Sequence, residues 1–314
     1  MLVTTEQIMR KGLHCVNVST EEIESRSIEC NKNEFKAHFG PSPRTAAAVW
    51  NDLCSTNIVD AQLSPNEKNE KGLHCFLMAL HFIWANPKNR FILKRRFNVS
   101  EKQASGEALW KWVERIAALE SSVIIWPQET FSDNNGPRFI LTVDTKDFKC
   151  WEKKHPLYNM DRSYASKKNG MHAGFKFEVA LSVFTDQIAW INGPFKATTH
   201  DLTIFRQGLK QQFHATCSGD IRKYIICDRG YQTSKASEQM LAVPSSTDTL
   251  PLKKFKSLAR CRQEDMNSRF ANYKMMSDEW TYTVEQFNVC FRAVAVLIQY
   301  GLNTGDNKLS IVQI

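Results

Sequence analysis

The sequence contains no apolar run long enough to cross a membrane, and residues 1–10 lack the apolar core of a secretory signal peptide. We therefore expect neither a membrane partner nor a secretory leader. CxxC pairs are also absent, although nine cysteines are scattered along the chain. This pattern indicates reduced thiols in an intracellular protein and argues against a zinc site. Long disordered stretches are not expected either, because 42% of the residues are hydrophobic and 24% are charged.

Positive charge is in excess: there are 41 Lys and Arg residues against 33 Asp and Glu, for a net charge of +8. This balance favours a polyanionic partner, although many basic proteins bind none. The 314 residues suffice for one large domain or two modest ones. The polar loop DNNGP is the expected boundary between a helical region at 1–132 and a second domain at 137–303.

The first region is predicted to be all-helical, with helices starting at Ser42-Pro43 and at Ser100. The segment NPKNRFILKRR at 86–96 is rich in basic residues and precedes a short turn at 98–100. A basic helix, a short turn and a second helix are typical of a helix-turn-helix, and a plain helical hairpin is the alternative. The residues predicted to bind DNA are Lys88, Arg90, Lys94, Arg95 and Arg96, together with Lys253, Lys254 and Lys256.

The pentapeptide KGLHC occurs twice, at residues 11–15 and 71–75. A His-Cys pair can ligate a metal, but the residues around the two copies share nothing, and we expect no second pair nearby. Coincidence or a duplicated fragment is the interpretation that we favour.

The second region is predicted to form a sheet with helices between its strands. The predicted strands cover residues 139–143, 175–184, 187–191 and 221–228. The middle two form an antiparallel hairpin that Asn192-Gly193-Pro194 should break, and a short helix follows His200-Asp201. Two helices complete the region, one around Glu264 and an apolar one over 284–300 that should pack on the sheet. The order strand, hairpin, helix, strand, helix is RNase H-like, so the predicted class is α+β, with a helix-turn-helix-like region before an RNase H-like domain.

Three carboxylates stand where such a fold has its chemistry. Asp144 follows the apolar run FILTV, Asp228 closes the strand YIIC, and Glu264 lies on the later helix. A carboxylate at the end of a buried strand faces the open edge of the sheet, where α/β proteins place their active sites. Two Mg²⁺ ions, with Mn²⁺ as a substitute, would activate the nucleophile and stabilise the leaving oxygen in phosphodiester cleavage. We assign Asp144 as the bridging ligand and give one ion each to the other two, although any one of these acids alone would be an ordinary surface residue.

Two further residues, Asp201 and Arg262, are candidates for orienting the metal ligands without contacting the metal themselves. For Asp201 we favour the alternative that its carboxylate caps the following helix through the amides of Thr203 and Ile204. In either case the predicted catalytic set is the three acids above.

Six sequence pieces, in order along about half of the chain, are similar to one known family. They are VD at 143–144, FEVALSVFTDQIAWINGPF at 177–195, HDLTIF at 200–205, CDRGY at 227–231, RCRQEDMNSRF at 260–270 and FRAVAVLIQY at 291–300. Together they resemble the DDE endonuclease domain of PIF/Harbinger-type transposases, especially the form common in algal and protist genomes. FKAHFGPSP and FNVS in the first region are similar to the helix-turn-helix region that precedes this domain.

The resemblance implies a metal-dependent DNA endonuclease and transposase that cuts and joins phosphodiester bonds. It assigns the catalytic and metal-binding roles to Asp144, Asp228 and Glu264. It also implies double-stranded DNA as a partner, self-association on DNA, a nuclear location and, as in related elements, a Myb-like accessory protein.

Three positions depart from the family pattern. Thr145 stands where glycine is frequent, Gln263 where histidine is frequent, and Ala271 where lysine is usual. None of these departures removes a carboxylate, and retention of all three acids favours an active enzyme. The alternative is a domesticated or degenerate copy that binds DNA or a partner protein without cutting, and an adaptor with no nucleic-acid role is a third hypothesis.

Overall fold

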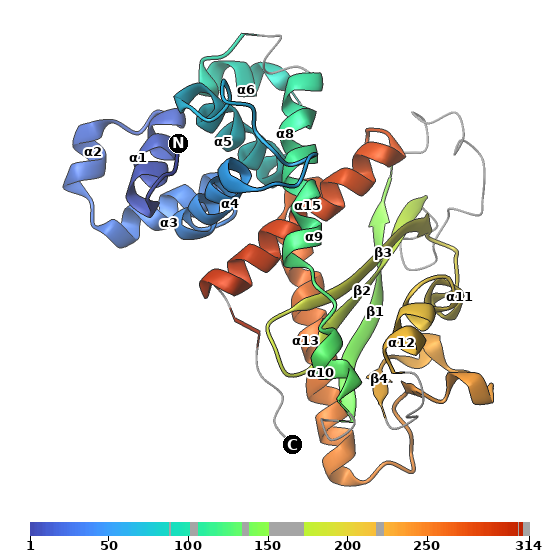
Figure 1. Cartoon of the computed structure of the whole chain (residues 1–314). Helices are drawn as coiled ribbons and strands as arrows, with labels where there is room; N and C mark the ends of the chain where they lie inside the picture. The colour runs from blue at the N-terminus through green and yellow to red at the C-terminus, as the bar shows by residue number, and fades with distance from the viewer. Residues whose placement is uncertain are drawn as a thin grey trace. The chain divides into compact units, whose positions relative to one another are not determined.

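The computed structural model of the chain describes residues 1–87, 89–100, 106–133, 138–150, 173–217, 223–306 and 308–309, and for Arg90 the backbone only. The chain forms two compact units. A helical unit comprises Met1–Val123, Arg269–Asp278 and Tyr282–Asn307, and a sheet unit comprises Ile124–Ser268, Glu279–Thr281 and Lys308–Ile314. The predicted α+β class is confirmed, because helices build the first unit and a five-stranded mixed sheet is the centre of the second (Figure 1). No helix in the described ranges is both long and apolar enough to span a membrane.

The helical unit is built from amphipathic and apolar helices. They are α1 (Thr5–Cys15), α2 (Thr20–Ser25), α3 (Ile28–Phe39), α4 (Pro43–Ser55), α5 (Glu70–Ala85), α6 (Arg90–Phe97), α8 (Glu107–Ala118), α9 (Glu120–Val123), α14 (Lys274–Ser277) and α15 (Val284–Thr304). The predicted start of α4 is confirmed, since Ser42 caps the helix and Pro43 occupies its first turn. Trp50, Phe76 and Trp112, from α4, α5 and α8, pack ring against ring in the core of this unit.

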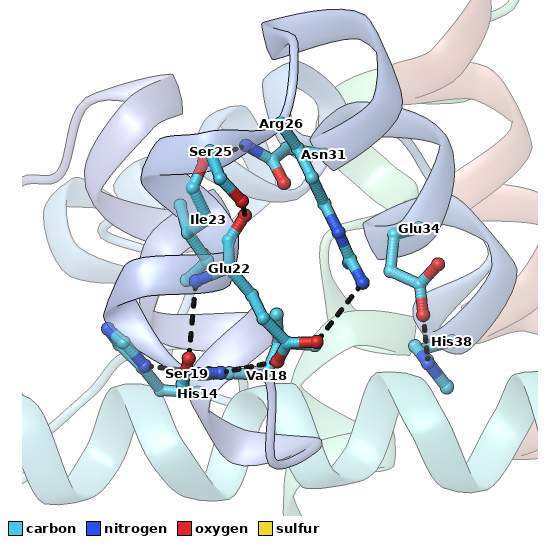
Figure 2. Close-up of polar contacts among 10 residues, drawn as sticks. All are labelled: His14, Val18, Ser19, Glu22, Ile23, Ser25, Arg26, Asn31, Glu34 and His38. Carbon is cyan, nitrogen blue, oxygen red and sulfur yellow. Dashed lines mark hydrogen bonds and ion pairs between the residues drawn. The ribbon is translucent and has the colours of Figure 1, made fainter.

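Residues 1–40 show no clear periodicity, yet they form three helices whose starts are capped by side chains. The Ser19 hydroxyl accepts a hydrogen bond from the Glu22 amide, while the Glu22 carboxylate accepts one from the Ser19 amide and pairs with Arg26 (Figure 2). Asn31 of α3 donates a hydrogen bond to the Ile23 carbonyl of α2, which ties these two helices together. Such capping stabilises the first turn of helices too short to be recognised by their apolar spacing.

The apolar helix α15, which we predicted to pack on the sheet, packs chiefly against α8, α9 and α4 of the helical unit. Its Tyr300 hydroxyl donates a hydrogen bond of 2.6 Å to the Asp52 carboxylate of α4. The predicted location is therefore wrong. A helix that is apolar around most of its circumference must be buried, but its sequence does not say against which partner.

The sheet has the strand order β3-β2-β1-β4-β5. Its strands are β1 (Phe139–Lys149), β2 (Gly174–Ser182), β3 (Ile188–Lys196), β4 (Tyr224–Ile226) and β5 (Leu241–Ala242). β2 is antiparallel to β1 and β3, whereas β4 is parallel to β1 and β5 is parallel to β4. The sheet unit also contains α10 (Gln128–Ser132), α11 (Asp201–Arg206), α12 (Leu209–Thr216), the short helices η4 (Arg229–Tyr231) and η5 (Ala236–Glu238), and most of α13 (Leu250–Asn272).

Two strands extend beyond their predicted ends. β1 continues past Asp144 to Lys149, because it keeps pairing with β2 over this length. β3 continues through Asn192-Gly193-Pro194 to Lys196, so the predicted break is wrong. Because β3 is an edge strand, the missing N–H of its proline is tolerated.

Helices cover both faces of the sheet (Figure 1). On one face, Val143 and Ile225 belong to a core shared with α11 and α12. On the other face, Ile226 packs against Phe255 and Ala259 of α13. Neighbouring residues of one strand therefore face different helices, and polar side chains that alternate along a strand also lie on opposite faces of the sheet.

Candidate active site

Asp144 and Asp228 are aligned by the parallel pairing of β1 with β4. In that register Thr142 lies opposite Ile226, and each aspartate follows two residues later on its own segment. Because side chains alternate between the faces of a strand, Asp144 shares the α13 face with Thr142. Asp144 lies inside β1 rather than at the end of the strand as we predicted. It does stand where the parallel part of the sheet ends, and this is what brings it level with Asp228.

α13 brings a row of polar side chains to the same place. The row, spaced three or four residues apart along one side of the helix, consists of Arg260, Gln263, Glu264 and Asn267. Gln263 is buried, and its side-chain oxygen accepts a hydrogen bond of 2.9 Å from the Thr142 hydroxyl. Its amide nitrogen donates one of 3.1 Å to the Val179 carbonyl. Gln263 thus fastens α13 to β1 and β2.

The Asp144 carboxylate is held at both oxygens. Oδ1 accepts a hydrogen bond of 2.8 Å from the Thr145 amide, and Oδ2 accepts one of 3.0 Å from the Asn267 side chain. These bonds set the direction of the carboxylate. The sequence prediction missed Asn267, although its place three residues after Glu264, on the same side of the helix, could have indicated it.

The Asp228 carboxylate caps η4, where its Oδ1 accepts a hydrogen bond of 2.7 Å from the Gly230 amide. A Cβ atom on Gly230 would lie 2.9 Å from this oxygen and 2.4 Å from Oδ2 of Asp201. Any larger residue would therefore push against two carboxylates. Within the segment CDRGY, the glycine is required by space rather than by its backbone angles.

The three predicted acids line one small pocket of about 50 Å³. Its complete lining is Thr142, Val143, Asp144, Ile226, Asp228, Arg260, Gln263 and Glu264. Glu264 is exposed and, within the described part of the chain, forms no hydrogen bond or ion pair. Across the same residues, no three His, Cys, Asp or Glu side chains are grouped closely enough to hold a metal ion. The structure thus brings the acids to one pocket, with two of them oriented, but does not gather the three carboxylates into one ligand set.

Asp201 faces the other side of the sheet and does not cap α11. His200 is the N-cap residue, and its ring nitrogen accepts a backbone amide of the first turn. The buried Asp201 carboxylate instead accepts hydrogen bonds from the Thr145 hydroxyl at 2.6 Å and the Lys176 ammonium at 3.0 Å. The capping role that we favoured is therefore wrong. Through Thr145, whose amide binds Asp144, Asp201 is connected to the acidic pocket from the opposite face of β1.

Glu178 lies in the same buried network and was not singled out from the sequence. It is fully buried, and its carboxyl group accepts hydrogen bonds from the Trp190 indole at 3.2 Å and the Tyr231 hydroxyl at 3.5 Å. Burial raises the pKa of Glu178 to about 8, against the lowering effect of these two hydrogen bonds. The carboxyl group is therefore mostly protonated at pH 7. An acid inside the apolar run FEVALSVF was the signal that could have found it.

Arg262 is buried between α13 and the turn that joins β2 to β3. Its guanidinium donates hydrogen bonds to the carbonyls of Ser182 at 3.0 Å and Thr185 at 2.7 Å. The β2 residue opposite Asp144 is Val179, three residues before the Ser182 that Arg262 contacts. These contacts of Arg262 fasten α13 to the sheet, and the supporting role we predicted for it at the metal ligands stays a prediction.

The basic residues predicted to bind DNA divide between the two units. In the helical unit, Lys88 and the side chain of Arg90 lie outside the described residues. Arg95 of α6 is exposed, whereas Lys94 and Arg96 are half-buried. Residues 101–105, where the second helix of the expected helix-turn-helix should begin, also lie outside the described residues, and α8 begins at Glu107. DNA binding by this segment stays a prediction.

The three lysines predicted to bind DNA from the sheet unit stand at the start of α13. Lys253 and Lys254 are exposed. Lys256 is buried, and its ammonium group lies 2.9 Å from the Asp248 carboxylate and 3.0 Å from the Val243 carbonyl. Contact with a phosphate would break this buried ion pair, so the predicted role of Lys256 does not fit the structure.

The two KGLHC copies lie side by side in α1 and α5, contrary to our expectation that no second pair stands nearby. Cys15 Sγ of the first copy is 3.2 Å from His74 Nδ1 of the second, and His74 Nε2 is 2.8 Å from the Phe97 carbonyl. Burial raises the pKa of the Cys15 thiol to about 12, so it is protonated at neutral pH. The contact packs two helices together, and its protonated thiol is not a nucleophile.

Comparison of the chain with models of known protein families, with curated proteins and with solved structures finds no match.

Proposed function

We propose that this chain is a metal-dependent DNA endonuclease and transposase in which Asp144, Asp228 and Glu264 are the catalytic acids. The observation that carries the proposal is that β1, the end of β4 and α13 bring these three acids to one pocket. The strand order β3-β2-β1-β4-β5, with β4 and β5 parallel to β1, supports an RNase H-like assignment of the sheet unit.

The chemistry of the pocket suits a hard divalent cation. Mg²⁺ prefers carboxylate oxygens and keeps several waters, so a few protein ligands suffice. Asp144 and Asp228 are already oriented by amide hydrogen bonds, whereas Glu264 is exposed and must turn toward them to complete the set. When bound, two cations activate an oxygen nucleophile and stabilise the leaving oxygen of a phosphodiester. Arg260, in the lining of the same pocket, offers a positive charge to the phosphate.

The remaining parts of the proposal rest on the resemblance and on charge. Double-stranded DNA as the substrate, self-association on DNA, a helix-turn-helix within residues 1–132, a nuclear location and a Myb-like accessory protein all follow from the resemblance. The net charge of +8 supports a polyanionic substrate.

The decisive experiment replaces Glu264 and measures cleavage and metal binding together. Glu264→Gln preserves shape but removes the charge, so Mg²⁺-dependent nicking of supercoiled DNA should fall by about a hundredfold or more, as for loss of one group that stabilises a transition state. DNA affinity should stay the same or tighten slightly, because the lost charge repels phosphate. Mn²⁺ affinity, measured by titration calorimetry, should weaken.

Asp265→Asn is the matched control for this experiment, because Asp265 is the neighbouring exposed acid on the same helix. It should change neither cleavage nor Mn²⁺ affinity. The proposal fails if the wild-type chain cleaves no DNA with Mg²⁺ or Mn²⁺ and Glu264→Gln leaves Mn²⁺ affinity untouched. Loss of cleavage in Asp265→Asn alone would move the ligand assignment to Asp265.

The second candidate is a chain derived from such an enzyme that binds DNA without cutting it. Two observations favour it: the three carboxylates do not form a grouped ligand set within the described residues, and Gln263, in place of the frequent histidine, is used for packing. This candidate predicts salt-sensitive DNA binding, no cleavage with either metal, and no effect of Glu264→Gln or Asp144→Asn on binding.

A further inference from the structure

A groove of about 800 Å³ runs along the β4–β5 edge of the sheet. Its walls are the starts of β1 and β4, the segment 229–239, β5 with the loop that follows it, and the start of α13. Its volume lies in the range of sites that hold an organic ligand, about 300–1,000 Å³. The groove is separate from the small acidic pocket, and no role assigned so far uses it.

Positive charge faces the groove. Three exposed cations line it and, among the described residues, none of them pairs with a carboxylate; they are Arg138, Arg229 and Lys235. The other two charged lining residues, Glu238 and Lys256, are each engaged in ion pairs within the sheet unit. The groove therefore offers its positive charge to a ligand and has no spare negative charge to repel an anion.

Two aromatic rings also line the groove. Phe139 and Tyr224 are half-buried, lie opposite each other in the register of β1 with β4, and have ring centroids 5.4 Å apart. Aromatic rings beside a row of cations are the arrangement by which proteins hold a single nucleic-acid strand, because bases stack on the rings while cations follow the phosphates. Intact duplexes keep their bases paired and cannot stack in this way.

The linings of the groove and of the acidic pocket include neighbouring residues. Arg229 directly follows Asp228 in the sequence, so one cation of the groove is adjacent to one acid of the pocket. Phe139 stands three residues before Thr142 on β1, which is about 10 Å along the strand. A strand a few nucleotides long would therefore reach from the rings to the acids.

We propose that this groove binds a single strand of nucleic acid, with bases on Phe139 and Tyr224 and phosphates on Arg138, Arg229 and Lys235. The choice of nucleic acid as the anion rests on the proposed function. The binding itself does not require cleavage and is measured without divalent metal.

The test is fluorescence anisotropy of the full chain in EDTA with labelled 12-nucleotide oligothymidylate or oligouridylate. The double variant Arg138→Gln with Lys235→Gln should lose about tenfold or more in affinity for the single strand. Removal of two phosphate contacts should lower the slope of log affinity against log salt by about 1.4, at about 0.7 per contact. The matched control is Lys149→Gln with Lys196→Gln, which removes two exposed charges from the same unit outside the groove and should change neither quantity.

Stacking is tested separately at Tyr224. Tyr224→Leu should weaken binding by about tenfold or more, the order expected for one stacked base, while Tyr224→Phe should retain it. Urea unfolding midpoints of both variants show whether the fold survives, and Tyr224→Phe keeps the test informative if Tyr224→Leu does not fold.

Tighter binding of oligothymidylate than of oligouridylate, or the reverse, supports the proposal and shows which of the two oligonucleotides the groove prefers. The proposal is overturned if neither oligonucleotide binds, if both double variants lose affinity equally, or if an oligoglutamate of the same length binds as tightly. These outcomes do not depend on catalysis, so the groove can stand if the nuclease fails and can fail if the nuclease stands.

Discussion

The two faces of the sheet surround their carboxylates with different groups. On the α11 face, Asp201 is buried and bound by the Lys176 ammonium, which also lies 3.7 Å from Asp147. On the α13 face, Asp144 is oriented by amide N–H groups, and Glu264 is exposed without an ion pair to any described residue. The same sheet thus carries one group of acids matched to protein cations and another group turned toward a pocket.

The difference lies in what compensates the charge of each acid. A buried charge costs several kcal/mol unless a partner compensates it, and the α11 face supplies that partner from within the protein. Acids at a pocket can be compensated by a ligand instead. Asp144 and Thr145 are neighbours in β1 and point to opposite faces, so the proposed catalytic acid on one face and the buried ion-pair network on the other are one residue apart in the sequence.

The largest effect should come from breaking the α11 face at Lys176. Lys176→Met leaves Asp201 and Asp147 buried without their cation, which should lower the free energy of unfolding by about 3–5 kcal/mol. Urea unfolding at pH 7 measures the loss, and Lys196→Met, an exposed lysine of β3, should stay within about 0.5 kcal/mol of wild type. Equal stability of the two variants would show that the network contributes nothing.

The next effect concerns Glu178 and depends on pH. Its pKa is raised to about 8 in the folded chain, against a reference value of 4.5. The unfolded chain releases this proton above pH 4.5 while the folded chain keeps it, so Glu178 costs stability increasingly as pH rises from 4.5 to 8. Glu178→Gln mimics the protonated form, and should be more stable than wild type by about 3 kcal/mol at pH 7.

Urea unfolding between pH 4.5 and pH 9 checks this prediction. The two chains should be equally stable near pH 4.5, separate up to pH 8, and remain apart by a constant amount above it. Parallel stability curves across the whole range would mean that Glu178 is ionised in the folded chain.

A smaller effect should appear where the two faces meet, at Gly230. A methyl group there would press on Asp228 and Asp201 together, so Gly230→Ala should destabilise the fold by about 1–3 kcal/mol. Gly301→Ala in α15 is the control, because its Cβ would meet only atoms 3.9 Å or more away. Thermal unfolding of both variants measures the difference, and Gly301→Ala should be neutral or stabilising. Similar losses in both would point to backbone effects instead of crowding.

The smallest effect on stability should come from the α13 face, at Asn267. Asn267→Ala removes one hydrogen bond to Asp144 and should cost about 1 kcal/mol. If the pocket binds metal, loss of this positioning contact should weaken Mn²⁺ affinity by about 10–100-fold. Ser268→Ala, at the adjacent exposed position, should leave Mn²⁺ affinity unchanged. A variant with normal Mn²⁺ affinity would remove Asn267 from the site.

Much of the chain was predictable where local rules dominate. The cap at Ser42, the β2–β3 hairpin and the α+β class were all predicted correctly, because capping, turn residues and apolar periodicity act over a few residues. Prediction failed at the end of β1, since its apolar run stops at Val143. The polar residues that follow are kept in the strand by pairing with β2 and by partners on α11.

The candidate site shows the same division. Asp144, Asp228 and Glu264 were each recognisable as acids at the ends of predicted elements, or at a set place on a helix. Asn267 and Glu178 were missed, because one acts only through α13 lying over β1 and the other only through being buried between Trp190 and Tyr231.

The sequence by itself determined the mixed helix and strand composition, the start of α4, the β2–β3 hairpin, which acids are candidates for catalysis, and that the chain carries excess positive charge. These follow from composition and from spacing within an element. Only the tertiary structure decided that Asp144 and Asp228 stand level, because that depends on the register between β1 and β4. It also decided that Asp201 is buried and paired with Lys176 while Glu264 is exposed. The free energy of a charge depends on the groups that distant parts of the chain pack around it.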